Sequence, residues 1–364
     1  MRRFLLCLLV AALVAASCGD DASSGDSDAA PAAQTTTTAA GITTSETTVP
    51  TSTTNAEPPT SQAASAELRV LVYNAGLAEG FVAHAVERQP LVAQAVADSP
   101  ADIVFLQEVW SPEAVADITA ATDARFPHQV FPEPIADEVS PEAEPSCTVD
   151  ELADLEGCVA TNCADASPDE LVDCVLNSCG AEFAGLCAEC QACIGSNVGS
   201  TVEEAVANCT AASAAFAYEG SVGLGLLSSA EILATEVLVL DSSLNRRAVV
   251  YALVDTEAFG EVHLFGTHLS AVFTDIPYPG EGTWEDEQAS QIEAILTFID
   301  GLVVPGEPVV LLGDFNTGPA GDGYEAEIPA NYEQLAAAFP LNPYVAGDAR
   351  CTFCGDNPLV GSGA

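Results

Sequence analysis

Apolar residues in the first half of the chain gather in short runs that end in polar residues. The runs 68–74 (LRVLVYN) and 101–110 (ADIVFLQEVW) have the length and composition of strands. Between them, 90–99 (PLVAQAVADS) predicts a helix, with Pro90 in the first turn, where a proline is tolerated. We therefore expect strands and helices to alternate in this part of the chain.

The second half is richer in strand-like runs. Four of them follow one another with little sequence between them, at 223–229, 232–240, 246–255 and 261–270. A helical segment around 284–302 and a further apolar run that begins at 309 come next. Consecutive strands with short connections favour antiparallel ribbons, so we expect a β-rich core flanked by helices.

The amino-terminal residues 1–18 have the features of an export signal. Arg2 and Arg3 precede an apolar run, 4–16, that is too short to span a bilayer and has the length of a signal-peptide core. The run ends in AASC, which resembles a bacterial lipobox, and in that case Cys18 becomes the lipidated first residue of the mature protein. We expect an exported bacterial lipoprotein, anchored in a membrane at the cell surface or in the periplasm. Plain secretion is the alternative.

A change of composition marks where the folded part begins. Residues 19–66 consist largely of Thr, Ser, Ala and Pro and show no apolar periodicity, which predicts a disordered tether. The remaining residues, 67–364, suffice for one large domain or two small ones. We expect one domain that carries an insert.

The chain is strongly acidic. It contains 54 Asp and Glu against 8 Lys and Arg, and none of the basic residues is a lysine. The resulting field repels phosphate backbones and disfavours a non-specific nucleic-acid binder. Acidic surfaces are also typical of proteins from saline environments, so the charge has two open explanations.

The 13 cysteines are distributed unevenly. Cys7 and Cys18 lie in the signal region, and nine of the other eleven lie between Cys147 and Cys209, where CVATNC (158–163) and CVLNSC (174–179) are similar pieces. Behind an export signal such spacings favour disulfides over a metal site, so we predict a disulfide-stapled, mostly helical insert at 140–215. The candidates are Cys147, Cys158, Cys163, Cys174, Cys179, Cys187, Cys190, Cys193, Cys209, Cys351 and Cys354. Their connectivity stays open, and since eleven is odd, one thiol is free or lacks its partner.

Four of the predicted strands end in polar residues. These are Asn74, Glu108, His268 and the pair Asp314 and Asn316. Side chains alternate along an extended chain, so Asp314 and Asn316 point the same way. Alone, Asn74 could cap a turn, Glu108 could end a strand in solvent and His268 could be a hydrogen-bonded core histidine. The pair Asp314 and Asn316 could form an ordinary turn. Together they favour one ligand site at the carboxyl ends of the strands.

The sequences around these residues resemble a known family. YNAG (73–76), LQEVW (106–110), THL (267–269) and GDFN (313–316) occur in the order found in the endonuclease/exonuclease/phosphatase (DNase I-like) superfamily and look most similar to bacterial neutral sphingomyelinases. The resemblance covers residues 67–135 and 220–358. It implies an α/β fold, namely a four-layer α/β/β/α sandwich, and metal-dependent hydrolysis of phosphate esters.

The resemblance also implies roles for the five residues. Glu108 would hold a divalent cation, Mg²⁺ or Mn²⁺, with Asn74 in its coordination shell, and such oxygen donors suit a hard cation that retains water. His268 would contact a phosphate oxygen, Asp314 would orient the attacking water and Asn316 would bind the phosphate. The cation would polarise the phosphoryl group. No covalent enzyme intermediate is implied.

One part of the family pattern is missing from the sequence. Members of the superfamily end with an Asp-His pair on a last strand, where the histidine is the general base. The four histidines here are His84, His128, His263 and His268, and none follows Asp314. We therefore expect the sequence to be a fragment without its C-terminal strand. The alternative is a truncated, inactive surface module that binds through the cysteine-rich insert.

The expected substrate is a phosphate ester with a lipid headgroup. LQEVW and THLSA look closer to sphingomyelinases and other lipid phosphodiesterases than to DNA-repair enzymes, and the chain has few of the Lys and Arg with which a nuclease tracks the backbone. We expect a monomeric phosphodiesterase that contacts the membrane through its lipid anchor, with nucleic acid the less favoured partner. An extracellular nuclease and a sugar- or inositol-phosphate phosphatase remain alternatives.

Overall fold

The computed structural model describes residues 67–135, 144–212, 216–274, 276–321 and 325–343. All of them belong to the second of the two units into which the chain divides, Met1–Gln62 and Ala63–Ala364. Several predictions fall outside the described residues: the signal peptide with Cys18, the tether 19–66, the disulfide candidates Cys351 and Cys354, and the expected loss of a C-terminal strand.

The described strands form two four-stranded sheets. Sheet A has the order β1-β2-β4-β3 and consists of β1 (Val70–Leu77), β2 (Ile103–Val109), β3 (His128–Val130) and β4 (Gly225–Ser228). Sheet B has the order β5-β6-β7-β8 and consists of β5 (Glu231–Leu240), β6 (Arg247–Thr256), β7 (Gly260–His268) and β8 (Val309–Asp314). Each sheet contains one parallel pair, β1 with β2 and β7 with β8, and the other pairs are antiparallel.

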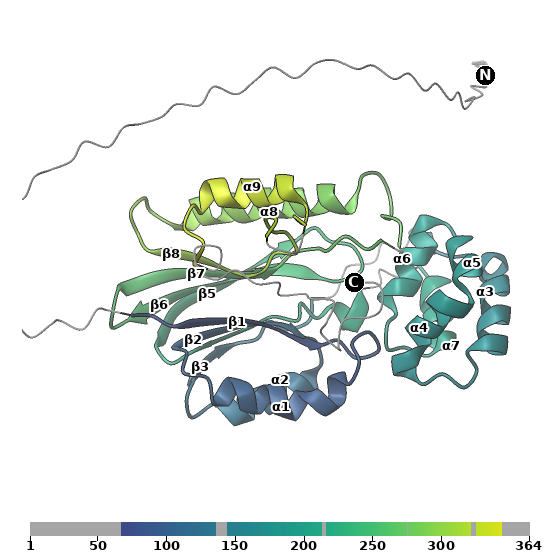
Figure 1. Ribbon diagram of the computed structural model, residues 1–364, viewed down its shortest axis with the longest axis horizontal. Helices are drawn as coiled ribbons and strands as arrows, with labels where there is room; N and C mark the ends of the chain where they lie inside the picture. Colours follow the sequence, from purple (N-terminus) through teal and green to yellow (C-terminus); the bar gives the residue numbers. More distant parts are fainter. Residues whose placement is uncertain (1–66, 136–143, 213–215, 275, 322–324, 344–364) are drawn as a thin grey trace, which may run out of the picture. The chain divides into compact units, whose positions relative to one another are not determined.

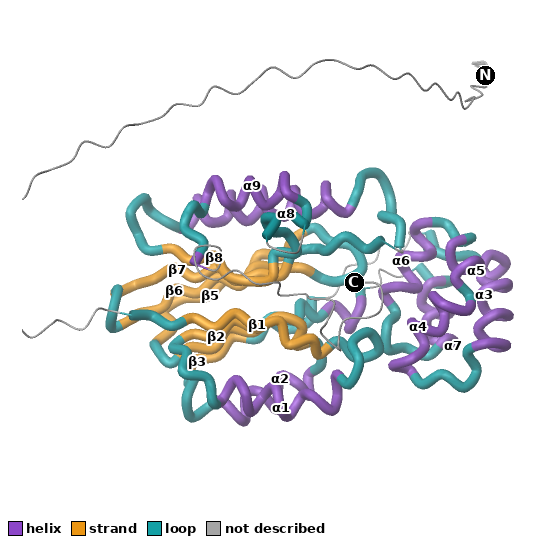
Figure 2. The backbone as a smooth tube through the Cα atoms, in the orientation of Figure 1, coloured by secondary structure: helices purple, strands orange, loops and turns teal. Residues whose placement is uncertain are grey.

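The two sheets face each other, and helices cover their outer faces (Figure 1). Helices α1 (Ala85–Ala97) and α2 (Pro112–Thr122) lie on sheet A, and helices α8 (Trp284–Leu302) and α9 (Pro329–Ala338) lie on sheet B. Figure 2 shows the same order as two inner layers of strand between outer layers of helix. The predicted four-layer α/β/β/α sandwich is confirmed.

Helix α1 begins five residues before its predicted start. Its buried face extends back to Ala85 and Gln89, so Pro90 lies inside the helix and not in its first turn. A proline inside a helix removes one backbone hydrogen bond. Contacts from outside the helix hold this segment instead, because Arg88 donates to the carbonyl oxygens of Ala75 and Gly76, each at 2.9 Å.

The core between the sheets requires a glycine. Phe105 of β2 is fully buried among apolar residues from β4, β6 and β7. A Cβ atom at Gly266 of β7 would lie 2.0 Å from Cε2 of Phe105. The Phe105 ring therefore occupies the space that a side chain at position 266 would need.

A cluster of short helices lies between β3 and β4 in the sequence. It consists of α3 (Val149–Asn162), α4 (Pro168–Ser178), α5 (Gly180–Ala184), α6 (Ala188–Ser196) and α7 (Val202–Cys209). Its core is small, with Leu152, Leu155, Phe183 and Leu186 buried among cysteines. So small a core needs covalent support.

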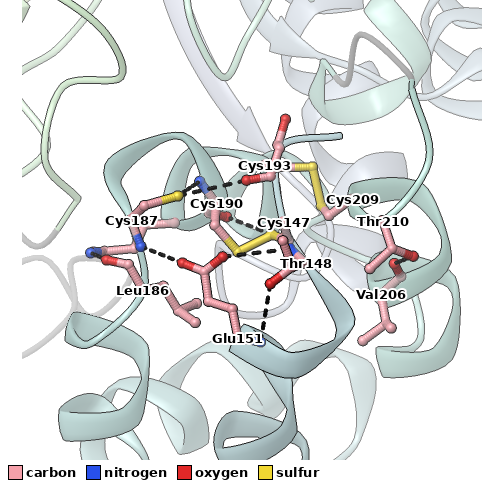
Figure 3. The surroundings of a disulfide bond; sticks show 12 residues. Cys147, Thr148, Glu151, Leu186, Cys187, Cys190, Cys193, Val206, Cys209 and Thr210 are labelled. Atoms are coloured by element: carbon pink, nitrogen blue, oxygen red, sulfur yellow. Dashed lines mark hydrogen bonds between the residues drawn. A yellow bond between two sulfur atoms is a disulfide. The ribbon is translucent and has the colours of Figure 1, made fainter. Parts of the chain in front are cut away.

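Four disulfides give the insert that support. The pairs are Cys147–Cys190, Cys158–Cys179, Cys163–Cys174 and Cys193–Cys209. The second and third join α3 to α4, so the two similar cysteine pieces pair in antiparallel order. The first and last hold α6 against the chain just before α3 and the end of α7 (Figure 3). The prediction of a disulfide-stapled helical insert is confirmed.

The prediction of Cys187 as a disulfide candidate is corrected. Among the described cysteines it is the one without a disulfide, because the neighbouring Cys190 is bonded to Cys147. The Cys187 sulfur accepts the backbone N–H of Cys190 at 3.4 Å, and Glu151 accepts the backbone N–H of Cys187 at 2.7 Å (Figure 3). Burial raises the pKa of the Cys187 thiol, and Glu151 adds to the shift, so the thiol is protonated at neutral pH.

Gly266→Ala should destabilise the sandwich, because the added Cβ atom displaces the Phe105 ring. Overpacking of this kind costs about 1–3 kcal/mol of unfolding free energy, which urea denaturation would measure. The control is Gly301→Ala in α8, where a Cβ atom has no neighbour within 4 Å. That change should stabilise the fold by about 0.5–1 kcal/mol. An unchanged unfolding free energy for Gly266→Ala would contradict the described packing.

Candidate active site

Two parallel strands of sheet A deliver Asn74 and Glu108. Asn74 of β1 pairs in register with Gln107 of β2, and Glu108 follows it. Glu108 has a φ of 57°, in the left-handed region that residues other than glycine rarely adopt. With the backbone turned in this way, Gln107 is fully buried while Glu108 reaches Asn74. Backbone conformations of this cost are typical of functional sites.

The parallel pair in sheet B delivers His268 and Asp314. These two residues are register partners at the ends of β7 and β8. Gly313 precedes Asp314 with a φ of 142°, and a Cβ atom there would lie 2.0 Å from the carbonyl oxygen of Thr267. Only a glycine allows β8 to approach β7 this closely, so the glycine of GDFN places Asp314 beside His268.

One amide group joins the two sheets at this end. Nδ2 of Asn74 donates to Oε1 of Glu108 and to Oδ2 of Asp314, each at 2.9 Å. The amide oxygen of Asn74 accepts the backbone N–H of Gly76 at 3.0 Å, which fixes the orientation of the amide. Carboxylates from β2 and β8, 206 positions apart in the chain, therefore meet at one point.

Asn316 fastens the turn after β8. Its φ is 45°, and its backbone N–H donates to Oδ1 of Asp314 at 3.1 Å. Its side-chain amide donates to the carbonyl oxygen of Leu269 at 2.8 Å. One N–H of the Asn316 amide is bonded in this way, and the residue positions Asp314 and joins the β8 turn to the end of β7. Its phosphate-binding role stays a prediction.

A buried glutamine in α8 supports the same turn. Nε2 of Gln288 donates to the carbonyl oxygens of Ser270 at 2.7 Å and Asn316 at 3.0 Å. Asn331 of α9 in turn donates to Oε1 of Gln288 at 3.0 Å. The sequence analysis missed both residues. The sequence feature that could have revealed Gln288 is its place on the helix face that also carries the buried Ile292 and Ile295.

His268 lies in an electrostatically unusual place. It is 3% exposed, and its Nδ1 has no hydrogen-bond partner among the described residues. Burial, followed by the positive charge of Arg247, lowers the pKa of His268 to about 3, against the opposing effect of Asp314. The imidazole is therefore neutral at neutral pH, with one N–H to donate.

The two carboxylates differ in acidity. Burial raises the pKa of Glu108, and the hydrogen bond from Asn74 opposes that shift. Burial acts on Asp314 too, but the Asn74 hydrogen bond, the Asn316 backbone N–H and the charge of Arg247 lower the pKa of Asp314 below its ordinary value. Asp314 is therefore ionised at neutral pH, and Glu108 is the carboxylate whose charge most needs a compensating cation.

Arg247 supplies part of that compensation. It begins β6, is 3% exposed, and its Nε and Nη1 find no acceptor among the described residues. Burial lowers its pKa to about 10, and the charges of Glu108 and Asp314 counteract the shift, so the guanidinium stays charged. The sequence analysis did not include Arg247 in the site. The sequence feature that could have revealed it is that Arg247 belongs to a rare pair of basic residues at the start of a predicted strand.

The donor set fits a divalent cation such as Mg²⁺. Two carboxylates, one with a raised pKa, lie within hydrogen-bond distance of the same amide. The described residues contain no cluster of three or more His, Cys, Asp or Glu that could hold a metal. Mg²⁺ commonly binds one or two protein carboxylates and keeps several waters, so two suffice. The Asn74 amide presents its nitrogen to the two carboxylates and so positions Glu108, and its place in the coordination shell stays a prediction.

His263, five residues before His268 in β7, lies on the opposite face of the sheet, as strand alternation predicts. Its ring contacts the Tyr251 hydroxyl at 3.0 Å and Glu307 at 3.1 Å, and Tyr251 packs under α8. His268 is thus the histidine that the structure brings to this site.

Arg247→Met should destabilise the fold, because Glu108 and Asp314 lose their buried counter-charge. Leaving partly buried charged groups without compensation costs about 1–3 kcal/mol of unfolding free energy. Without Arg247 the pKa of folded Glu108 rises further, and an acid with a raised folded pKa destabilises the fold more as pH rises. The loss should therefore be larger at pH 8 than at pH 5, as urea denaturation in EDTA would show. Arg247→Lys, which keeps the charge, should lose less at both pH values. Wild-type stability of Arg247→Met at pH 8 would rule out this role.

Several solved structures are similar to the described fold. Sphingomyelinase C from Streptomyces griseocarneus is 17% identical over 76% of this chain and 70% of that chain, with a TM-score of 0.43. A double mutant of beta toxin from Staphylococcus aureus, with bound magnesium ions, is 14% identical over 76% and 71%, with a TM-score of 0.44. An endonuclease/exonuclease/phosphatase from Beutenbergia cavernae is 17% identical over 74% and 53%, with a TM-score of 0.39. No curated protein matches the chain.

The family comparison is decisive. Residues 73–334 match the profile of the Endonuclease/Exonuclease/phosphatase family, a range that includes all five of the strand-end residues. This match covers well over half of the chain and agrees with the two-sheet sandwich. The chain therefore belongs to the Endonuclease/Exonuclease/phosphatase family, a family of phosphate-ester hydrolases.

Proposed function

We propose that this protein is a divalent-metal-dependent phosphodiesterase that acts on phospholipid headgroups. The observation that carries the proposal is the single Asn74 amide, which holds Glu108 and Asp314 from two sheets beside a neutral His268. A site with ionised oxygens on one side and an N–H donor on the other can hold a cation and a phosphate together. Membership of a phosphate-ester hydrolase family supports the same chemistry.

Each site residue has a role in this proposal. Glu108, with Asn74 in the coordination shell, would hold Mg²⁺ or Mn²⁺, and such an ion supplies charge stabilisation to a phosphoryl group when bound. Neutral His268 would donate an N–H to a non-bridging phosphate oxygen. Ionised Asp314 would accept a hydrogen bond from water and so orient it, and Asn316, which fastens Asp314, would line the phosphate pocket. Phosphoryl transfer of this kind depends on positioning and electrostatics.

The headgroup preference and the cellular location are also proposals. A chain with 54 acidic and 8 basic residues attracts a DNA backbone poorly, which supports a lipid over a nucleic acid. We further propose export as a lipoprotein anchored through Cys18, with residues 19–66 as tether, 67–364 as a monomeric catalytic domain and 140–215 as its insert. Among the described residues, none of the helices combines the length and the apolarity that a membrane span requires.

Two variants test the mechanism against sphingomyelin and plasmid DNA. His268→Ala should lower turnover about 10²–10³-fold at saturating Mg²⁺, because it removes a donor aimed at developing charge. Glu108→Gln should raise the Mg²⁺ concentration needed for half-maximal activity, and EDTA should abolish activity in every variant. His128→Ala, a histidine in β3 outside the site, is the matched control and should keep wild-type rates.

The outcomes separate the alternatives. Activity that resists EDTA, or wild-type rates in both site variants, would refute the mechanism. DNA cleavage without lipid turnover would keep the mechanism and replace the substrate with nucleic acid. Release of inorganic phosphate from sugar or inositol phosphates, with both diesters untouched, would make the protein a phosphatase. A folded protein inactive on all of them would favour the binding module.

A further inference from the structure

Strand β1 contains one extra residue where it reaches the candidate active site. Asn74 pairs with Gln107 of β2 and Leu77 pairs with Val109, so three steps along β1 match two steps along β2. A β-bulge of this kind is common beside active sites, where it re-aims a side chain. Here the bulge lies directly after Asn74, whose amide joins the two carboxylates of the site.

Arg88 of helix α1 holds the two residues of the bulge. Its Nη1 donates to the carbonyl oxygen of Gly76 and its Nη2 to that of Ala75, each at 2.9 Å. Gly76 has a left-handed φ of 57°, and a Cβ atom there would lie 3.4 Å from Nη1 of Arg88. Glycine thus gives the guanidinium room. A planar guanidinium binds two acceptors in a fixed geometry, which an ammonium group does less rigidly.

The bulge in turn orients the side chain of Asn74. The backbone N–H of Gly76 donates to Oδ1 of Asn74 at 3.0 Å. With its oxygen fixed to the bulge, the amide presents its nitrogen to Oε1 of Glu108 and Oδ2 of Asp314, each at 2.9 Å. An unbroken series of hydrogen bonds therefore leads from Arg88 on the outer helix to both carboxylates between the sheets.

A second link between Arg88 and the site is electrostatic. Burial raises the pKa of Glu108, and the Asn74 hydrogen bond and the charges of Arg247 and Arg88 oppose that shift. Arg88 is half-buried, and the two carbonyl oxygens that it binds carry no net charge. These bonds therefore leave its positive charge available to Glu108. Contact and charge make different demands on the side chain, so variants can separate them.

We propose that Arg88 is a positioning residue of the candidate active site, which fixes the β1 bulge from α1 and so aims Asn74 at Glu108 and Asp314. The inference rests on the proposed function, because Glu108 and Asn74 are the residues proposed to hold the cation. It also gives the early start of α1 a purpose. A helix that began at Pro90 would not include Arg88.

The side-chain amide of Asn74 reports on its own orientation in the full-length chain without any cation. In EDTA, labelling with isotope-enriched asparagine gives a pair of side-chain amide NMR signals for each asparagine, and the pair that disappears in Asn74→Ser belongs to Asn74. Arg88→Ala should move this pair toward the positions of a solvent-exposed asparagine. Alanine has the highest helix propensity, so α1 should persist. Added guanidinium chloride, well below denaturing concentrations, should restore the original positions.

Calorimetric titration with Mg²⁺, in the absence of any substrate, measures the effect on the proposed cation site. Arg88→Ala should weaken Mg²⁺ binding about 10–100-fold, as is usual when a residue that orients a metal ligand is lost. Arg88→Lys keeps the charge but loses the planar fork, so its Mg²⁺ affinity and its Asn74 signals should fall between those of the wild-type protein and Arg88→Ala.

The matched control is Arg125→Ala. Arg125 also donates to a backbone carbonyl oxygen of this half of the sandwich, that of Ala101 at 2.7 Å, just before β2 and at the opposite end of that strand from Glu108. Its loss should leave the Asn74 signals and the Mg²⁺ affinity unchanged.

Four results would overturn the inference: unshifted Asn74 signals or wild-type Mg²⁺ affinity in Arg88→Ala, wild-type behaviour of Arg88→Lys in both measurements, or equal changes in Arg125→Ala. If Arg88→Ala does not fold, the same measurements on Arg88→Lys decide. A wild-type protein that binds no Mg²⁺, while its Asn74 signals still depend on Arg88, would uphold the positioning role and overturn the proposed function.

Discussion

Two carboxylates from different sheets, Glu108 and Asp314, share one amide donor, and much of the described structure serves to keep them there. Half-buried carboxylates that share one donor repel each other, and each also loses hydration. Asn74 bonds to both, and the charge of Arg247 acts on both. The same two acids make the site attractive to a divalent cation. The charges that destabilise the arrangement are therefore the charges that the proposed function requires.

The geometry of this contact depends on backbone positions where a side chain would not fit or would be strained. Gly313 lets β8 approach β7, and Gly266 gives room to the Phe105 ring between the sheets. Together they set how close the carboxyl ends of β1, β2, β7 and β8 come to one another. Glu108 itself adopts a left-handed conformation. The packing of the sandwich must stabilise that conformation, because an isolated strand end would not adopt it.

The insert and the sandwich are stabilised by different interactions. The sandwich is stabilised by three broad apolar layers, whereas the insert has few apolar residues and four disulfides. Its position against the loop after β1 rests on close contacts: a Cβ atom at Gly80, in that loop, would lie 2.8 Å from the backbone nitrogen of Gly199.

The sequence by itself determined the order of the longer strands and of helices α1 and α8, and the polar residues at or near the carboxyl ends of four strands. The strand predicted to end at Asn74 runs on to Leu77. Apolar runs, turn residues and helix caps act over a few positions, so the strand at 309 and the helix at 284 could be predicted from neighbours alone. The early start of α1 could not be predicted from neighbours alone, because the first turns of the helix are held by hydrogen bonds from Arg88 to carbonyl oxygens of β1. The disulfide pairs could not either, since cysteine spacing leaves many pairings open until the helices pack.

Only the tertiary structure decided which polar residues complete the site. Arg247 and Gln288 are ordinary in sequence, and they become important because the sandwich removes them from water next to Glu108 and the β8 turn. The meeting of Asn74 with Asp314 spans 240 positions. Contacts of that range depend on how two sheets and four helices pack. Burial removes water from Arg247 and Gln288, and their charge and hydrogen bonds then act directly on Glu108 and on the β8 turn.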